Sequence, residues 1–211
     1  MNESTRRNFL KRTAIVTSLG AGPAVSGLAG KSTTHKFVDT LIEFKPSHIQ
    51  GVGVFAARDL KKGEVIAEGI HEKDYKTLVP WAEFESYDPT LRQRILDFCI
   101  GTPAGFIPPE NFDFNALSIS WYFNHSCDPN LGFNDKGDFT AIVDISMGQE
   151  LTYDYGCSDS NPAFLLNCSC GTSRCRHKVT GNDWRDPGFR ASHIQYMLPR
   201  LKREPGKTPT A

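Results

Sequence analysis

Residues 122–130 read Tyr-Phe-Asn-His-Ser-Cys-Asp-Pro-Asn, and residues 148–156 read Gly-Gln-Glu-Leu-Thr-Tyr-Asp-Tyr-Gly. The amide of Asn124 and the imidazole of His125 directly follow three aromatic residues, Trp121, Tyr122 and Phe123. Buried polar groups need hydrogen-bond partners, so Asn124 and His125 are either site residues or satisfied structural residues. The second stretch predicts a strand over residues 150–155, on which Tyr153 and Tyr155 point to one face. Two such phenols can wall a pore for a lysine side chain, although packed core tyrosines give the same pattern.

A glycine pair precedes these stretches and a cysteine motif follows them. Gly51 and Gly53 enclose Val52 ahead of a β-rich run. Such a loop lets backbone approach a ligand closely, and it is equally typical of a plain turn at a strand end. Downstream, the pattern Cys168-x-Cys170-x4-Cys175 offers three thiolates, whereas a tetrahedral zinc site takes four ligands. Disulfide pairing is the alternative, although Cys168 and Cys170 are too close to bridge each other easily.

Taken in order, the four motifs resemble the SET-domain family of protein-lysine methyltransferases with a post-SET cysteine motif. The resemblance covers about residues 36–185. It implies that S-adenosyl-L-methionine is bound by Gly51, Val52, Gly53, Asn124, His125 and Tyr155. It also implies that Tyr155 is the catalytic tyrosine and that Tyr153 limits transfer to one or two methyl groups. The implied zinc ligands are Cys127, Cys168, Cys170 and Cys175.

Two regions depart from the family pattern, and one further residue has several interpretations. Trp121 stands where the family often has an arginine, three residues before Asn124, which puts any contact of that arginine in doubt. Phe112 and Phe114 occupy the region where members tend to carry a further tyrosine, so the lysine channel is expected to be built differently. Trp184 follows the cysteine motif, where it covers the cofactor, lines the lysine channel or anchors the C-terminal helix.

Many short strands and few helices predict a β-rich α+β fold. By resemblance, this is the SET fold of several small sheets with a knot-like crossing, followed by a post-SET zinc segment and a C-terminal helix. Strands are predicted over 37–44, 65–67 and 139–143, short helices within 80–100, and a loop over 101–115. Asp186 and Pro187 predict the start of the last helix, which Pro199 kinks or ends. The predicted division is a leader over 1–30, the SET domain over 36–156, the zinc segment over 157–185, the helix over 186–203 and a tail over 204–211.

The leader resembles a twin-arginine export signal, because Arg6 and Arg7 precede Phe-Leu-Lys and an apolar stretch rich in Ala and Gly. This reading implies a prokaryotic source and export from its cytoplasm. The alternative is a basic N-terminus of a cytoplasmic protein, which the cellular supply of S-adenosyl-L-methionine favours. Four basic side chains and one acidic side chain give the leader a charge of about +3, which leaves about −3 on the rest.

Composition excludes several classes of protein. The 211 residues carry 24 basic and 24 acidic side chains, so broad non-specific nucleic-acid binding is not expected. A hydrophobic share of 39% argues against a disordered chain. No stretch beyond the leader is long enough to cross a bilayer. We expect a monomer that acts on a protein or peptide with an accessible lysine.

Two further sets of residues have competing interpretations. Five aspartates favour a basic peptide or form a solvated acidic surface, namely Asp135, Asp138, Asp144, Asp154 and Asp159. Cys99 and Cys157 lie outside the predicted zinc site as ordinary thiols, unless an oxidising compartment pairs them. Two alternatives to an enzyme are a catalytically silent SET-like binding module and an exported protein held by disulfides.

Overall fold

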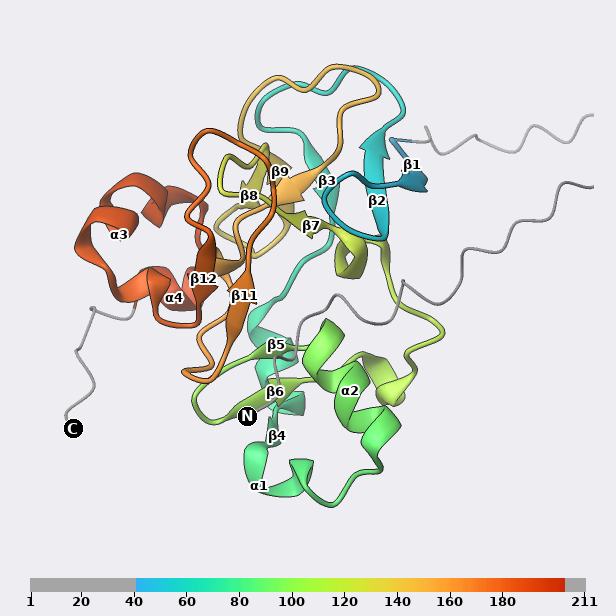
Figure 1. Ribbon diagram of the computed structural model, residues 1–211, viewed down its shortest axis with the longest axis vertical. Helices are drawn as coiled ribbons and strands as arrows, with labels where there is room; N and C mark the ends of the chain where they lie inside the picture. Colours follow the sequence, from blue (N-terminus) through green and yellow to red (C-terminus); the bar gives the residue numbers. More distant parts are fainter. Residues whose placement is uncertain (1–40, 204–211) are drawn as a thin grey trace, which may run out of the picture.

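The computed structural model describes residues 41–203, so the predicted leader and tail lie outside the described residues. Figure 1 shows small sheets in the upper part of the molecule and a second group of strands and helices below them. The strands are β1 (Ile42–Pro46), β2 (Val52–Ala56), β3 (Val65–Ala67), β4 (Val79–Pro80), β5 (Ile100–Gly101), β6 (Gly105–Ile107), β7 (Asn124–His125), β8 (Leu131–Phe133), β9 (Phe139–Ala141), β10 (Thr152–Tyr153), β11 (Leu165–Asn167) and β12 (Lys178–Thr180).

Helices in the described part of the chain are short. The α-helices are α1 (Trp81–Phe84), α2 (Pro89–Phe98), α3 (Pro187–His193) and α4 (Pro199–Arg203). The 3-10 turns are η2 (Glu72–Thr77), η3 (Glu110–Phe112), η4 (Ile119–Tyr122), η5 (Tyr155–Cys157), η6 (Asp183–Arg185) and η7 (Ile194–Tyr196). No helix in residues 41–203 is long and apolar enough to cross a membrane.

The central five-stranded sheet has the order β3-β9-β8-β10-β7. β10 pairs in parallel with both β7 and β8, which residues 126–130 connect. The backbone amides of Ser126 and Asn130 donate to the carbonyls of Tyr153 and Thr152, so this connection is also bonded to β10. A strand late in the chain is thereby inserted between two strands that are neighbours in sequence, which produces the predicted crossing.

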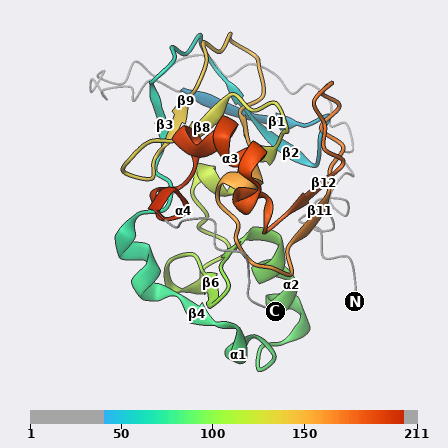
Figure 2. The same cartoon turned by 90° about the vertical axis from the view of Figure 1, so that its left-hand side faces the viewer.

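Three smaller sheets surround this one. β1 and β2 form an antiparallel pair, β11 and β12 form another, and β4, β6 and β5 form a three-stranded antiparallel sheet. In Figure 2, α3 is drawn in front next to β8, and α4 lies below it. Gly132 of β8 lies so close to Tyr196 that a Cβ atom added there would be 2.7 Å from that residue's Cβ.

The buried side chains form two clusters. The larger cluster includes Phe123, Tyr153, Tyr155 and Trp184, whereas the smaller one is centred on Phe106 beside α2. α2 begins at Pro89, where the Asp88 carboxylate caps the helix by accepting hydrogen bonds from the amides of Thr90 and Leu91 at 2.9 and 3.1 Å. Its last turn carries Asp97 and Phe98 to the boundary between the two clusters.

Several local predictions are confirmed. The strand over 65–67, the helices within 80–100 and the Asp186 cap are all present, and the Asp186 carboxylate accepts from the Phe189 amide at 2.7 Å. The first described strand starts at Ile42 and continues to Pro46, and the strand predicted over 139–143 ends at Ala141. The prediction of a loop over 101–115 is wrong, because β6 pairs there with β4 and β5.

Two longer predicted elements are interrupted. The C-terminal helix is divided into α3 and α4 by η7, and Pro199 begins the second helix rather than kinking a single one. The strand predicted over 150–155 ends at Tyr153, and Tyr155 starts the 3-10 turn η5. The Asp154 side chain accepts a hydrogen bond from the Gly156 amide at 2.9 Å, which stabilises this turn in place of strand pairing.

Candidate active site

The loop between β1 and β2 turns sharply at Gly51. Gly51 has a φ of 52°, which favours glycine, and its carbonyl accepts from the Ser47 amide at 2.9 Å. Gly53 is required for a different reason: a Cβ atom there would lie 2.8 Å from the carboxylate carbon of Glu150. The Glu150 carboxylate in turn accepts from the Ser47 hydroxyl at 2.9 Å. The loop is therefore packed directly against the segment that leads into β10.

Asn124 connects the same loop to the central sheet. Its Nδ2 lies 2.8 Å from Glu150 Oε1, 3.1 Å from the Gln50 carbonyl and 3.3 Å from the Val52 carbonyl. An amide nitrogen has two hydrogens, so these three acceptors share two donors. The predicted Asn124 and Gly51–Gly53 thus belong to one bonded unit.

A cavity next to this unit, cavity A, collects most of the predicted cofactor residues. Val52, Asn124, His125 and Tyr155 line it, whereas Gly51 and Gly53 do not. The two glycines therefore determine the conformation of the loop without lining the cavity. Leu166, Cys168 and Ser169 line the same cavity from the cysteine segment.

A second cavity, cavity B, has a volume of about 650 Å³ and is lined by Tyr153 but not by Tyr155. The two tyrosine rings nevertheless pack together, with centroids 4.8 Å apart. Phe98 and Trp121 line both cavities. Cavities A and B therefore meet at an aromatic boundary made of Tyr153, Tyr155, Phe98 and Trp121.

The two predicted tyrosines belong to this boundary, together with aromatic residues from other segments. Phe112 lines cavity B, but Phe114 is buried in the smaller core cluster. The sequence predicts Phe98 only as an apolar residue of a short helix, because it belongs to none of the four motifs. Trp184 is 1% exposed, lines neither cavity and donates from its indole nitrogen to the Gly181 carbonyl at 3.0 Å, so it is a packing anchor.

The Tyr155 side chain and backbone are both held by the 123–127 segment. Its phenol donates to the Phe123 carbonyl at 2.9 Å, and its amide donates to His125 Nδ1 at 3.1 Å. Because Nδ1 accepts, the proton of the neutral imidazole lies on Nε2, which is 3.2 Å from the Cys127 sulfur. His125 therefore connects the backbone of Tyr155 to the cysteine cluster.

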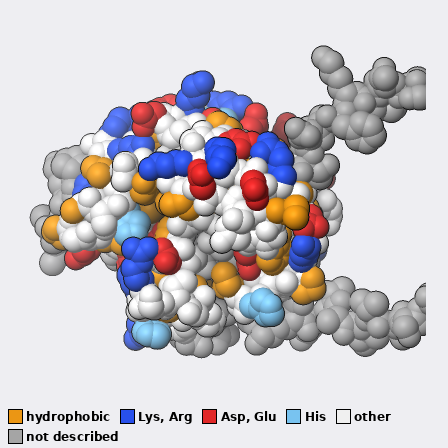
Figure 3. Space-filling view, turned by 90° about the horizontal axis from the view of Figure 1, so that it is seen from above, with side chains coloured by type: hydrophobic (Ala, Val, Ile, Leu, Met, Phe, Trp, Pro, Cys, Tyr) orange, Lys and Arg blue, Asp and Glu red, His pale blue; other side chains and the backbone are white. Residues whose placement is uncertain are grey.

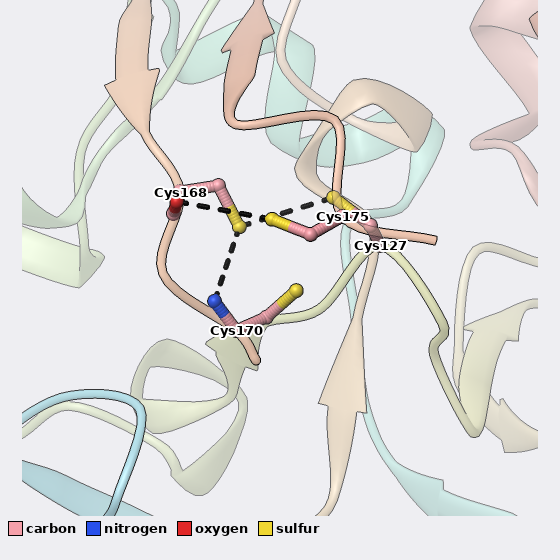
Figure 4. Close-up of side chains that lie close together, drawn as sticks. All are labelled: Cys127, Cys168, Cys170 and Cys175. Carbon is pink, nitrogen blue, oxygen red and sulfur yellow. Dashed lines mark hydrogen bonds between the residues drawn. The ribbon is translucent and has the colours of Figure 1, made fainter. Parts of the chain in front are cut away.

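Four cysteines converge at one point (Figure 4). The sulfurs of Cys127, Cys168, Cys170 and Cys175 all lie within 4.8 Å of one another. Cys127 and Cys168 have sulfurs 3.8 Å apart, too far for a disulfide bond and equal to the edge of a tetrahedron with bonds of about 2.3 Å to zinc. The four residues thus fit a structural zinc site.

The pKa values of two of these thiols bear on whether the cluster suits a metal ion. Burial raises the pKa of Cys127 to about 11. Burial acts to raise the pKa of Cys170 as well, but hydrogen bonds to Thr172 and Cys168 outweigh it and lower that pKa to about 6. Four thiolates at this spacing repel one another, so a dication that neutralises them suits the cluster. Cys99 and Cys157 are buried in different core clusters and form no disulfide bond with each other.

The five aspartates do not form a single surface, either for a basic peptide or for solvent, because Asp154 and Asp159 are buried. Asp135, Asp138 and Asp144 pair with Lys202, His71 and Lys61 respectively. Asp154 pairs with Arg176, and Asp159 accepts from the amides of Gly101 and Asn161. The acidic residues that line cavity B are instead Glu68, Asp74 and Glu110. Figure 3 shows acidic and basic side chains interspersed on the face seen from above.

Comparison with known proteins identifies one matching family and several related proteins. Residues 51–156 match the family described as SET domain. The histone-lysine N-methyltransferase Su(var)3-9 of Drosophila melanogaster is 29% identical over 200 residues, which cover 82% of this chain and 30% of that protein. An H3 lysine-4 specific histone-lysine N-methyltransferase of Cryptococcus neoformans var. neoformans serotype D (strain B-3501A) is 27% identical over 146 residues, which cover 64% of this chain and 9% of that protein.

A solved structure was also matched, that of KRYPTONITE in complex with mCHG DNA and SAH. It has 22% sequence identity and a TM-score of 0.43, and the match covers 65% of this chain and 28% of that chain. This chain therefore spans less than a third of the length of each of these three proteins.

Proposed function

Because the chain belongs to the SET-domain family, we propose that it transfers methyl groups from S-adenosyl-L-methionine to lysine side chains of a protein substrate. The observation that carries this proposal is the aromatic boundary, where Tyr155 lines cavity A and Tyr153 lines cavity B. Transfer of a methyl group between ligands in two cavities requires the cavities to meet, and they meet at these aromatic residues. Cavity A would take the cofactor and cavity B the substrate lysine.

The residues of cavity A suit the cofactor. Val52, Asn124 and His125 would bind it, while Gly51 and Gly53 would keep the loop close. When bound, the cofactor supplies a sulfonium whose methyl group is open to attack by a lone pair. Holding that methyl group and the amine in line is the main task of the protein.

The protein must also accommodate a deprotonated amine, because a free lysine has a pKa of about 10.4. Tyr153, Phe98 and Trp121 provide an aromatic passage in which desolvation disfavours the ammonium form. The Tyr155 phenol donates its hydrogen to the Phe123 carbonyl, so its oxygen lone pairs are available to accept from the amine N–H. Tyr155 would thereby orient the nitrogen lone pair toward the methyl group.

Tyr153 would limit the product to mono- or dimethyllysine. Its ring packs against Phe139 and Phe133, with centroids 5.0 and 5.6 Å away, which holds it in position. The phenolic oxygen, 3.4 Å from the Ser158 hydroxyl, would occupy space that a larger methylated amine needs.

Zinc would complete the site from the C-terminal side. Cys127 belongs to the segment that holds Tyr155, whereas Cys168, Cys170 and Cys175 lie in the connection between β11 and β12. Ligation by all four would hold the predicted post-SET segment, 157–185, against cavity A, which Cys168 and Ser169 line. Metal binding would then be coupled to ordering of the cofactor site.

The substrate class is a protein or peptide with an accessible lysine, and the enzyme is proposed to act as a monomer without direct nucleic-acid contact. Glu68, Asp74 and Glu110 in cavity B suit a peptide with basic residues near the target lysine. The leader and the need for cofactor still favour different compartments. Fractionation of cells that carry the native chain or an Arg6→Lys, Arg7→Lys variant would locate the protein.

The decisive experiment combines purified protein, methyl-labelled cofactor and a whole-cell lysate, with label followed on lysine residues. We expect transfer that Tyr155→Phe abolishes. The runner-up function, a catalytically silent module, predicts cofactor binding with no label transfer by the native chain. A protein held by disulfides predicts neither zinc nor free thiols in the purified chain.

A further inference from the structure

The last turn of α2 places a carboxylate in the wall of cavity A. Asp97 is 1% exposed and lines this cavity next to Phe98. Its Oδ1 accepts a hydrogen bond from Gln93 Nε2 at 2.8 Å, one helical turn earlier. The side chain is therefore held in place within α2 while its carboxylate belongs to the cavity wall.

Asp97 contributes the one Asp, Glu, Lys or Arg side chain to the described lining of cavity A. Much of the remaining wall is apolar or aromatic, including Val52, Trp121, Phe123 and Leu166. A charge in such a wall is poorly screened by water, so it acts strongly on any charged ligand in the same cavity. Asp97 lies outside the four sequence motifs.

We propose that Asp97 makes cavity A selective for a cationic cofactor, so that the sulfonium form binds more tightly than the neutral thioether product. This inference rests on the proposed function. In the transfer, the methyl carbon–sulfur bond breaks and a methyl carbon–nitrogen bond forms, and the substrate nitrogen has lost its proton to solvent. The cofactor loses one positive charge, so its attraction to Asp97 falls after each turnover.

The position of Asp97 favours the cofactor over the substrate as its target. The substrate lysine is also a cation, but Asp97 lines cavity A and is absent from the lining of cavity B. Phe98, the next residue, lines both cavities and lies at their boundary. Asp97 therefore acts on the cofactor side of that boundary.

The test is calorimetric titration of S-adenosyl-L-methionine and S-adenosyl-L-homocysteine into the full chain. Asp97→Asn keeps an oxygen that can accept from Gln93 and removes the charge. We expect it to weaken binding of the sulfonium by about tenfold or more and binding of the thioether by less than about threefold. Asp97→Glu should retain the preference for the sulfonium. Glu85→Gln, which removes an exposed carboxylate paired with Arg92 of α2, is the matched control and should change neither affinity.

Equal weakening of both ligands by Asp97→Asn would overturn the inference and assign Asp97 a structural role. Should that variant fail to fold, the native chain still provides a test with an analogue that carries an amine in place of the sulfonium. Native protein that prefers neither cationic ligand over the thioether would also overturn it. If the native chain binds none of the three ligands, the proposed function itself fails. Binding without selectivity overturns only the role of Asp97.

Discussion

Arg176 binds the carboxylate of Asp154 through two hydrogen bonds, 2.6 Å from Nη1 to Oδ2 and 2.8 Å from Nη2 to Oδ1. Asp154 is 1% exposed and stands between Tyr153 and Tyr155, while Arg176 directly follows Cys175. Burial acts to lower the pKa of Arg176, but the hydrogen bonds and charge of Asp154 outweigh it and raise that pKa. This planar pair joins the cysteine segment to the two tyrosines without passing through the sulfurs.

Removal of the Arg176 charge should destabilise the protein. Arg176→Gln leaves the buried Asp154 carboxylate without its cation, so we expect the free energy of unfolding to fall by about 3–5 kcal/mol in urea denaturation. Arg174→Gln is the control two residues earlier, because Arg174 pairs with Asp128 at the exposed surface. That change should cost less than about 1 kcal/mol. Similar losses for both variants would contradict the buried role of the Arg176–Asp154 pair.

Tyr155→Phe should stop methyl transfer and leave the fold in place. The variant loses the hydrogen bond to the Phe123 carbonyl, worth about 1 kcal/mol of stability, and the oxygen that orients the amine. We expect a rate at least about 100-fold lower, with cysteine-bound zinc unchanged by elemental analysis. Activity near that of the native chain would exclude Tyr155 as the catalytic residue.

Tyr153→Phe should raise the number of methyl groups added to one lysine. The phenylalanine ring keeps the packing against Phe139 and frees the volume of one oxygen atom. Mass spectrometry of the product should show trimethyllysine where the native chain stops at mono- or dimethyllysine. Ser158→Ala removes the hydroxyl 3.4 Å from the Tyr153 oxygen, lines neither cavity and should not change the methylation state.

Gly53→Ala should weaken cofactor binding through Glu150. The added Cβ atom would overlap the Glu150 carboxylate and disturb its hydrogen bond from Asn124. We expect the dissociation constant of S-adenosyl-L-methionine to rise about tenfold in calorimetry. In a Glu150→Ala background the same change should have little further effect, because the overlap is gone. Fully additive losses would show that Gly53 acts by another route.

Zinc binding should release protons. Without metal, the Cys127 thiol has a pKa of about 11 and is protonated at pH 7, whereas zinc binds the thiolate. Cys170, with a pKa of about 6, is ionised at pH 7 and becomes protonated below pH 6. Zinc affinity should therefore rise with pH and fall more steeply below pH 6. Calorimetry in buffers of different ionisation enthalpy measures the proton count, and Cys99→Ser should leave that count unchanged.

The cysteine cluster and the grouping of Asn124, His125 and Tyr155 could be predicted from the sequence. Local spacing defines each motif, and the resemblance to a known fold indicates which motifs lie together. The motifs were not sufficient for residues whose place depends on packing between distant segments. Phe98 and Asp97 reach cavity A because α2 ends there, and a helix pattern alone contains no information about its endpoint in space. The strand prediction over 150–155 failed at Tyr155 for a related reason, since the Asp154 side chain bonds its own backbone there.

The insertion of β10 between β7 and β8 has a consequence for how the protein folds. β7 joins the central sheet only through β10, so it can take its edge position only after β10, which comes later in the chain, has paired with β8. The contacts that build the tyrosine pair are therefore non-local, and their formation carries the entropy cost of closing the intervening loop. The site around the two tyrosines should therefore form after the β1–β2 hairpin, whose contacts are local.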